Sequence, residues 1–105
     1  MKEISVTELK AKIDNKEDFQ LVDVREPHEF EICSLGGLEV PMSEVLAKYK
    51  EISKDKMVVV HCRSGQRSAN VINALEQNYG YNNLYNLVGG ILAWADEIDD
   101  DMETY

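Results

Sequence analysis

The sequence predicts an α/β domain built on a mostly parallel sheet. Segments typical of strands alternate with segments of helical period along the chain. The clearest strand, residues 57–60, is apolar at every position, as expected of a strand that is buried on both faces of a parallel sheet. A length of 105 residues suits one domain, so we predict a single unit over residues 1–105.

Local signals in the first third predict a helix, a strand and a second helix. Ser5 and Glu8 have the spacing of a capping box, so a helix is expected to begin after Ser5. Residues 19–24 form an apolar segment that ends in Val-Asp-Val and is typical of a strand. Pro27 can open a short helix that runs to Ile32, because proline is well tolerated at the first helical position.

The middle of the chain continues the alternation. Residues 38–40 are interpreted as a short strand that Pro41 ends. Ser43 is placed to cap the next helix, whose apolar residues fall on one face. The buried strand at residues 57–60 follows it.

The last third contains a longer helix, a strand and a final helix. Residues 67–77 suit a helix that ends at Gly80. Residues 84–88 are interpreted as the last strand. A glycine pair, residues 89–90, then turns the chain into a helix that Trp94 is expected to anchor in the core. The pair would also permit close backbone approach near the preceding loop.

Composition and charge exclude several classes of function. The formal net charge is −9, which argues against a nucleic-acid partner and against an anionic membrane surface. The N-terminus lacks the apolar stretch of a signal peptide, and no apolar run could span a bilayer. With only two cysteines, free thiols in a reducing cytoplasm are expected. The acidic residues 96–103 are interpreted as a solvated tail, with a docking patch for a basic partner as the alternative.

Residues 58–68 carry the strongest chemical signal. Cys62 follows a buried strand and precedes a helix, which is where ligands bind in open α/β sheets. The helix N-terminus, together with Arg63 and Arg67, creates a positive field that would lower the pKa of the thiol. Gly65 permits a tight turn around the sulfur, and the serines that flank it in the loop can add hydroxyl donors. Cys62 is therefore predicted to be a nucleophile.

The other candidate residues favour structural interpretations. Cys62 itself could be a buried structural thiol, but its polar, basic loop fits that reading poorly. Cys33 has no basic neighbour and is interpreted as inert, while a resolving role would require it to lie close to Cys62. The side chain of His61 should point away from that of Cys62, so it is interpreted as a packed histidine. Asp23 and Arg25 are interpreted as a structural ion pair.

Three motifs in order resemble the rhodanese-type sulfurtransferase domain. They are Asp-Val-Arg-Glu at 23–26 with Glu-Phe at 29–30, the loop at 58–68, and Tyr-Asn-Leu-Val-Gly-Gly-Ile-Leu-Ala-Trp at 85–94. The resemblance covers nearly the whole chain. It implies a mostly parallel five-stranded sheet that is flanked by helices on both faces.

The resemblance also implies a mechanism and a set of site residues. Cys62 would take a sulfane sulfur from thiosulfate or from a persulfide on a donor protein, and would pass it to an acceptor nucleophile. No metal and no organic cofactor is implied. The substrate would be bound by the loop residues Arg63, Ser64, Gly65, Gln66, Arg67 and Ser68.

One stretch departs from the usual family pattern. Residues 33–38, Cys-Ser-Leu-Gly-Gly-Leu, lack the histidine that most members have there and are one residue shorter. This variant is similar to the rhodanese domains fused behind the adenylyltransferases that serve sulfur carriers for molybdopterin, thiamine or tRNA thiolation. A sulfur-carrier protein is therefore a second candidate partner, and the chain is either free-standing or one domain of such a fusion.

Two alternative functions remain open at the level of sequence. A cysteine-dependent phosphatase or arsenate reductase would share the scaffold, but the phosphatase pattern places five residues between cysteine and arginine. Here four residues separate Cys62 from Arg67, a loop better suited to one sulfur atom than to a phosphoryl group. A non-catalytic interaction module would be expected to lack the cysteine or its basic loop, and this chain keeps both.

Overall fold

The computed structural model describes residues 1–105 and contains one five-stranded sheet. Every neighbouring pair of strands is parallel, and the strand order is β1-β5-β4-β2-β3. The predicted α/β class and the five-stranded sheet are confirmed. The strands are β1 (Glu3–Ile4), β2 (Gln20–Asp23), β3 (Leu38–Glu39), β4 (Val58–His61) and β5 (Leu84–Leu87).

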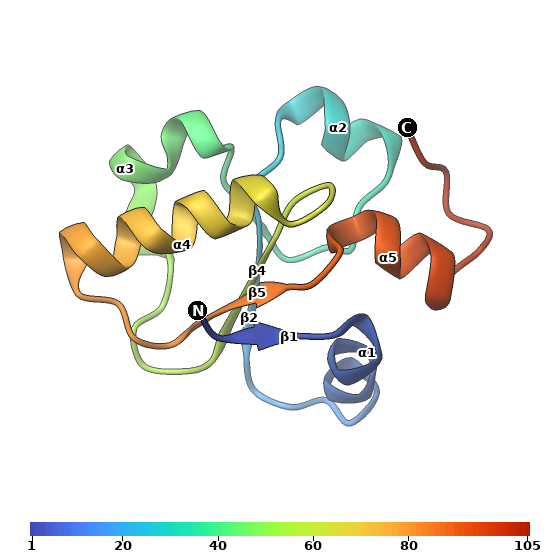
Figure 1. Cartoon of the computed structure of the whole chain (residues 1–105), viewed down its shortest axis with the longest axis horizontal. Coiled ribbons are helices and arrows are strands. Elements are labelled where there is room, and N and C mark those ends of the chain that lie inside the picture. Colours follow the sequence, from blue (N-terminus) through green and yellow to red (C-terminus); the bar gives the residue numbers. More distant parts are fainter.

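Helices cover both faces of the sheet, as Figure 1 shows. No helix is both long and apolar enough to cross a bilayer. The α-helices are α1 (Val6–Asp14), α2 (Pro27–Ile32), α3 (Val45–Lys48), α4 (Gln66–Tyr79) and α5 (Gly90–Glu97). The predicted capping box is present at the start of α1, where the Ser5 hydroxyl accepts the N–H of Glu8 and the Glu8 carboxylate accepts the N–H of Ser5, both at 3.1 Å.

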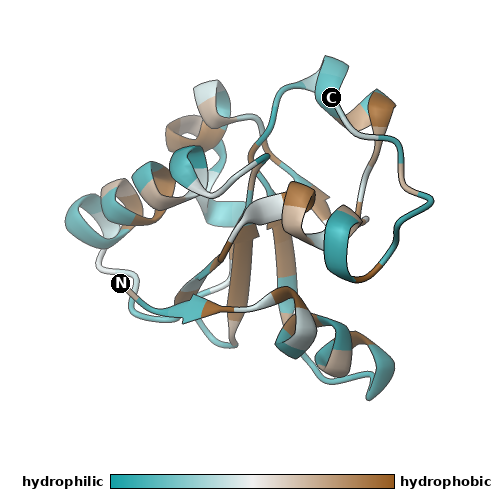
Figure 2. Cartoon of the chain, turned by 45° about the vertical axis from the view of Figure 1, so that its right-hand side comes forward, coloured by the Kyte–Doolittle hydropathy of each residue, from teal (hydrophilic) through white to brown (hydrophobic).

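Two hydrophobic clusters hold the layers together. Successive side chains of a strand point to opposite faces, so Val58 and Val60 of β4 enter one cluster and Val59 enters the other. The larger cluster packs against α3 and α4, and the smaller one joins α1 and α5 to the sheet, with Trp94 as its largest member. Figure 2 shows the apolar strands between helices whose outer faces are hydrophilic.

The segment around Ser43 differs from the expectation of a serine-capped helix. It begins as a 3₁₀ turn over Met42–Glu44, and α3 is only four residues long. The Ser43 hydroxyl does not cap α3 but donates to the Glu26 carboxylate at 3.3 Å. The N–H of Met42 bonds to the carbonyl oxygen of Val24 at 3.0 Å, so the end of β2 positions this segment.

A buried ion pair joins the end of β2 to α2. Arg25 Nη2 donates to Asp23 Oδ2 at 2.8 Å, and both side chains are fully buried. The same guanidinium donates to the carbonyl oxygens of Glu29 and Cys33, at 3.2 and 2.7 Å. His61 lies 3.8 Å from Asp23 with both ring nitrogens unpartnered, and burial lowers its pKa. The imidazole is therefore neutral and packed at neutral pH.

Candidate active site

Cys62 lies directly beyond the carboxyl end of β4, the central strand, and its side chain is buried. Its Sγ accepts hydrogen bonds from the backbone N–H groups of Gly65 at 3.1 Å and Ser68 at 3.4 Å. The Ser68 hydroxyl lies 3.4 Å from the same sulfur. Since Ser68 belongs to the first turn of α4, the sulfur occupies the N-terminal end of that helix.

Helix α4 begins without a capping side chain of its own. Its N-cap residue is Gly65, which has a φ of +110°, a backbone conformation that favours glycine. A glycine cannot bond the free N–H groups of the first turn through a side chain. The Cys62 sulfur takes that role by accepting the N–H of Ser68, the third residue of the helix. The helix thus begins around the cysteine.

This arrangement lowers the pKa of the Cys62 thiol. Burial acts in the opposite direction, because a thiolate is poorly solvated in the interior. The hydrogen bonds from the Ser68 hydroxyl and from the N–H groups of Ser68, Gly65 and Ser64 together outweigh it. The helix dipole also favours the anion. More of the nucleophilic thiolate is therefore present at neutral pH than in an ordinary cysteine.

Asn86, on the neighbouring strand β5, holds both the loop and the Ser68 hydroxyl. Its Nδ2 donates to the Gly65 carbonyl oxygen at 3.1 Å, and its Oδ1 lies 2.5 Å from the Ser68 hydroxyl. That hydroxyl has one proton, which can point to Asn86 or, when Cys62 is ionised, to the sulfur 3.4 Å away. Asn86 is itself buried. The strand next to β4 therefore fixes the groups that surround the sulfur.

The N-terminus of α5 packs against the backbone of the same loop. The N–H of Ile91 donates to the Cys62 carbonyl oxygen at 3.0 Å, and the N–H of Leu92 donates to that of Arg63 at 3.1 Å. These N–H groups have no partner within α5 because they belong to its first turn. Gly90 permits the approach, since a Cβ there would lie 2.5 Å from the Arg63 oxygen and 2.6 Å from the Cys62 oxygen.

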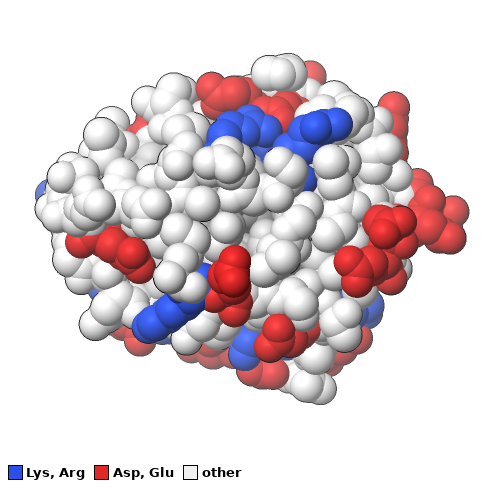
Figure 3. Space-filling view, in the orientation of Figure 1, with Lys and Arg blue, Asp and Glu red and all other residues white.

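The two loop arginines already have partners within the chain. Arg67 donates from Nη1 and Nη2 to the two carboxylate oxygens of Glu29, at 2.6 and 2.8 Å. Arg63 donates from Nε to the backbone oxygen of Tyr105 at 2.9 Å, and its guanidinium lies over the Tyr105 ring. Figure 3 shows a small group of basic side chains over the start of α4, with acidic side chains beside it.

Three residues at the site were not singled out from the sequence. Glu29 was noted only as part of a motif, Asn86 only as part of a strand and of the closing motif, and Tyr105 not at all. Tyr105 donates its hydroxyl to Glu29 at 2.6 Å and accepts from Arg25 at 3.0 Å. These two Tyr105 contacts join residues 76 and 80 positions apart, so no local pattern indicates them. The position of Glu29 three residues after Glu26, as in a capping box, was the one available signal.

The remaining predicted loop residues lie at the rim, and Cys33 lies elsewhere. Ser64 and Gln66 are exposed, and Gln66 opens α4. Cys33 is half-buried at the end of α2, where its sulfur lies 3.7 Å from Arg25 Nη1. The structure thus gathers the predicted loop around Cys62 and leaves the second thiol in a different setting.

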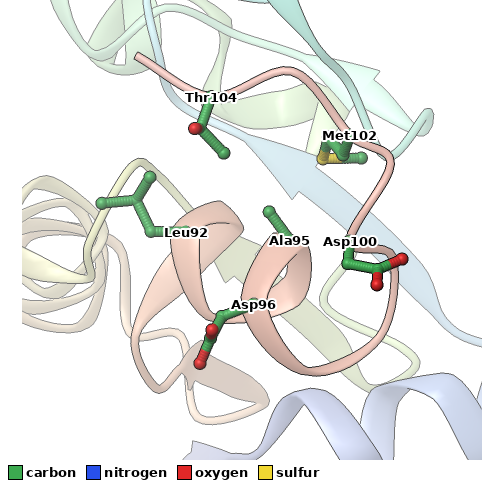
Figure 4. Close-up of a pocket in the computed structure, with 6 residues that line it drawn as sticks. All are labelled: Leu92, Ala95, Asp96, Asp100, Met102 and Thr104. Atoms are coloured by element: carbon green, nitrogen blue, oxygen red, sulfur yellow. The ribbon is translucent and has the colours of Figure 1, made fainter.

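The larger of the two cavities in the domain lies beside helix α5. It has a volume of about 370 Å³ and opens between α5 and the C-terminal segment, as Figure 4 shows. No residue from 62 to 68 lines it. The lining residues are Leu92, Ala95, Asp96, Asp100, Met102 and Thr104.

A family model for the rhodanese-like domain matches residues 5–97. The chain belongs to the rhodanese-like domain family. A solved rhodanese-like domain protein from Staphylococcus aureus superposes with a TM-score of 0.82 at 32% sequence identity, over 93% of this chain and 95% of that one. The family predicted from the three motifs is therefore confirmed.

Relatives of this rhodanese-like domain include short proteins and longer, multidomain ones. It is 40% identical to a sulfurtransferase of Allochromatium vinosum, over 89% of this chain and 87% of that protein. It is 37% identical to the rhodanese-like/PpiC domain-containing protein 12 of Arabidopsis thaliana, over the whole chain but only 38% of that protein. It is 32% identical to the adenylyltransferase and sulfurtransferase MOCS3-2 of Zea mays, over 97% of this chain and 23% of that protein. These relatives support a role in sulfur transfer in general.

Removing the Ser68 hydroxyl from the rhodanese-like domain should make Cys62 less reactive. In Ser68→Ala the thiolate keeps its backbone donors but loses a side-chain hydrogen bond, so the pKa of Cys62 should rise. A hydrogen bond to a charged group contributes about 1.5–3 kcal/mol, so we expect iodoacetamide alkylation at pH 7 to slow about tenfold or more. The rate should be measured from pH 5 to 10.

The control for this experiment is Ser64→Ala, which removes an exposed hydroxyl and keeps the backbone N–H that faces the sulfur. It should leave the pH profile in place. If Ser68→Ala alkylated with the profile of the unmutated protein, the hydroxyl would have no part in stabilising the thiolate.

Adding one methyl group at Gly90 should displace the loop of the rhodanese-like domain. The new Cβ would collide with the Cys62 and Arg63 carbonyl oxygens, at a residue whose φ is +59°. Misplacement of reacting groups by about 1 Å can cost about 100-fold in rate, so we expect Gly90→Ala to lose sulfur transfer on that scale. Steady-state assays beside urea unfolding curves measure the two effects.

Gly80→Ala separates collision from backbone strain. Gly80 has a similar φ of +68°, but a Cβ there would meet no atom within 4 Å. Its variant should lose some stability and keep its activity. Equal losses of activity in the two variants would assign the effect to strain alone.

Proposed function

We propose that this rhodanese-like domain is a sulfurtransferase that carries a sulfane sulfur as a persulfide on Cys62. The observation that carries the proposal is the set of donors that converges on one sulfur atom. Two backbone N–H groups and the Ser68 hydroxyl surround the Cys62 Sγ within 3.1–3.4 Å. Neutral donors of this kind suit an anion whose charge lies on one sulfur atom, as it does in the Cys62 thiolate.

The proposed cycle has two displacement steps. The Cys62 thiolate attacks the outer sulfur of the donor, the donor's S–S bond breaks, and the leaving group departs with the electron pair. An acceptor nucleophile then attacks the outer sulfur of the Cys62 persulfide and releases the Cys62 thiolate. The sulfane sulfur is transferred without net oxidation, so the cycle requires no external oxidant or reductant.

The pairing of Arg67 with a carboxylate within the chain favours sulfur transfer over phosphoryl transfer. A phosphatase requires an arginine that binds the oxygens of the transferred group, since charge develops on those oxygens in the transition state. Here both terminal nitrogens of Arg67 are bound to the Glu29 carboxylate. The short loop and the paired arginine both support sulfur as the transferred atom.

Relatives of the adenylyltransferase and sulfurtransferase class suggest a protein partner. The similarity to MOCS3-2 extends over 97% of this chain. We infer that the donor or the acceptor is a protein that carries sulfur, with thiosulfate as the alternative small donor. The two free thiols fit a reducing compartment such as the cytoplasm.

The test is to load the protein and locate the sulfur. The purified domain is incubated with a sulfane sulfur donor, and its intact mass is measured before and after addition of cyanide. We expect a gain of one sulfur atom that maps to the peptide containing Cys62 and is lost to cyanide. A gain that maps to the Cys33 peptide would refute the proposal, as would the absence of any gain with thiosulfate and persulfide donors alike.

A further inference from the structure

Each arginine near the site already has a hydrogen-bond partner within the chain, and two of the three are paired with a carboxylate. Thiosulfate is a dianion, and sulfite leaves as a dianion when its outer sulfur is taken. Of the three arginines nearby, Arg25 is buried against Asp23, Arg63 bonds to Tyr105 and Arg67 bonds to Glu29. The sulfur itself is surrounded by neutral donors only.

Glu29 is the residue that neutralises Arg67. Its carboxylate is almost fully buried and accepts from Arg67 through both oxygens. The N–H of Glu26 at 3.0 Å and the hydroxyl of Tyr105 at 2.6 Å hold it in place. The ion pair with Arg67 lowers the pKa of Glu29 to about 2, against the opposing effect of burial. The pair therefore persists throughout the physiological pH range.

These charges determine the electrostatic energy of a sulfur donor that approaches the cysteine loop. The attraction between two opposite charges grows as their separation shrinks and as their surroundings become less polar. A dianion that approached Arg67 would gain that attraction and lose a comparable amount to Glu29. The net charge of −9 adds a further repulsion. A persulfide with no charge or one charge on its sulfur meets a much smaller penalty.

We propose that Glu29 is a specificity-determining residue that selects thiol persulfides over the dianion thiosulfate as sulfur donors. The inference rests on the proposed sulfur transfer through Cys62. The favoured step is attack of the Cys62 thiolate on the outer sulfur of R–S–SH. It gives Cys62–S–SH and R–S⁻, so the proton stays on the transferred sulfur and the electron pair leaves with the thiolate.

The experiment measures kcat/KM for thiosulfate and for two persulfides, cysteamine persulfide and an uncharged decapeptide with one persulfidated cysteine. The wild-type domain should use both persulfides at least about tenfold better than thiosulfate. A preference within the persulfide pair identifies whether the natural carrier is a small thiol or a polypeptide, and either preference supports the proposal.

The decisive variant is Glu29→Gln, which removes the charge and keeps an oxygen that can accept the Glu26 N–H. It should raise the ratio of thiosulfate to persulfide kcat/KM about tenfold, chiefly through a lower KM for thiosulfate and more strongly at low salt. Glu29→Gln combined with Arg67→Gln should return the ratio to its wild-type value, because the freed cation is gone.

The matched control is Glu26→Gln, which neutralises a neighbouring acid that contacts Ser43 and no arginine. Its ratio of thiosulfate to persulfide kcat/KM should equal that of the wild-type domain. The urea unfolding curve of Glu29→Gln must first show that the variant is folded. The proposal would then be overturned if this variant kept the wild-type ratio of thiosulfate to persulfide kcat/KM, or if Glu26→Gln raised that ratio equally. Failure of every donor to load wild-type Cys62 would instead refute sulfur transfer itself, so the two failures are distinguishable.

Discussion

Replacement of Cys62 by serine is expected to abolish sulfur loading while leaving the fold intact. A serine hydroxyl is not ionised at neutral pH and cannot hold a persulfide. It is close in size to the thiol and can still accept the N–H groups of Gly65 and Ser68, so the start of α4 should be preserved. Loss of a catalytic nucleophile typically costs at least about 10³-fold, so turnover should fall below detection. Intact mass and steady-state rates measure the two effects.

Cys33→Ser is the matched control for that loss. Cys33 is half-buried, and its sulfur accepts one weak side-chain hydrogen bond, from Arg25 at 3.7 Å. This variant should load sulfur on Cys62 and discharge it as the unmutated protein does. If Cys33→Ser also lost turnover, the two thiols would act together, and the cycle through a single cysteine would be wrong.

Removal of the Asp23 carboxylate is expected to cause the largest loss of stability. Asp23→Ala leaves the Arg25 guanidinium buried without its counter-ion, at a site where both side chains have no solvent exposure. Breaking a buried pair in this way costs about 3–5 kcal/mol, a large part of the roughly 5–15 kcal/mol that stabilises a typical domain. Urea unfolding should show this decrease, and the Tm should fall by more than about 10 °C.

The exposed pair between Asp18 and Lys56 provides the comparison. Its carboxylate and ammonium groups lie 3.0 Å apart, with side chains 85% and 43% exposed. Asp18→Ala should change the free energy of unfolding by less than about 1 kcal/mol, because water screens and solvates both charges. A loss below about 1 kcal/mol in Asp23→Ala as well would show that water or a relaxed neighbour replaces the carboxylate.

The sequence patterns predicted most of the architecture because most elements carry their own local signals. The apolar run at 57–60, the Ser5–Glu8 capping box and Pro27 each act within one element, and each element lies where it was expected. Strand β1 was missed since it has two residues, too few for any period to be seen. It exists because Glu3 and Ile4 pair with Asn86 and Leu87 at the edge of the sheet.

In the cysteine loop, too, local sequence signals predicted one part of the structure and contacts between distant residues decided the rest. A cysteine between a buried strand and a helix with a nearby glycine was sufficient to predict an activated thiol. The sequence could not show that Arg67 would form an ion pair with Glu29, 38 residues earlier. It also could not show that the Asn86 side chain would lie within hydrogen-bond distance of the Ser68 hydroxyl. Such partners are set by which strands lie side by side, and β2, β4 and β5 are adjacent only in the folded sheet.

By itself, the sequence determined the fold class, the family and the candidate nucleophile, because each depends on spacing along the chain. Only the tertiary structure decided the electrostatics of the site, since charge interactions depend on distance in space. Two arginines that suggested an anion-binding loop both bond to partners that folding brings to them, and one of the two, Arg67, is neutralised by the Glu29 carboxylate. The sulfur is left among neutral donors, and that environment bears on which donor the site accepts.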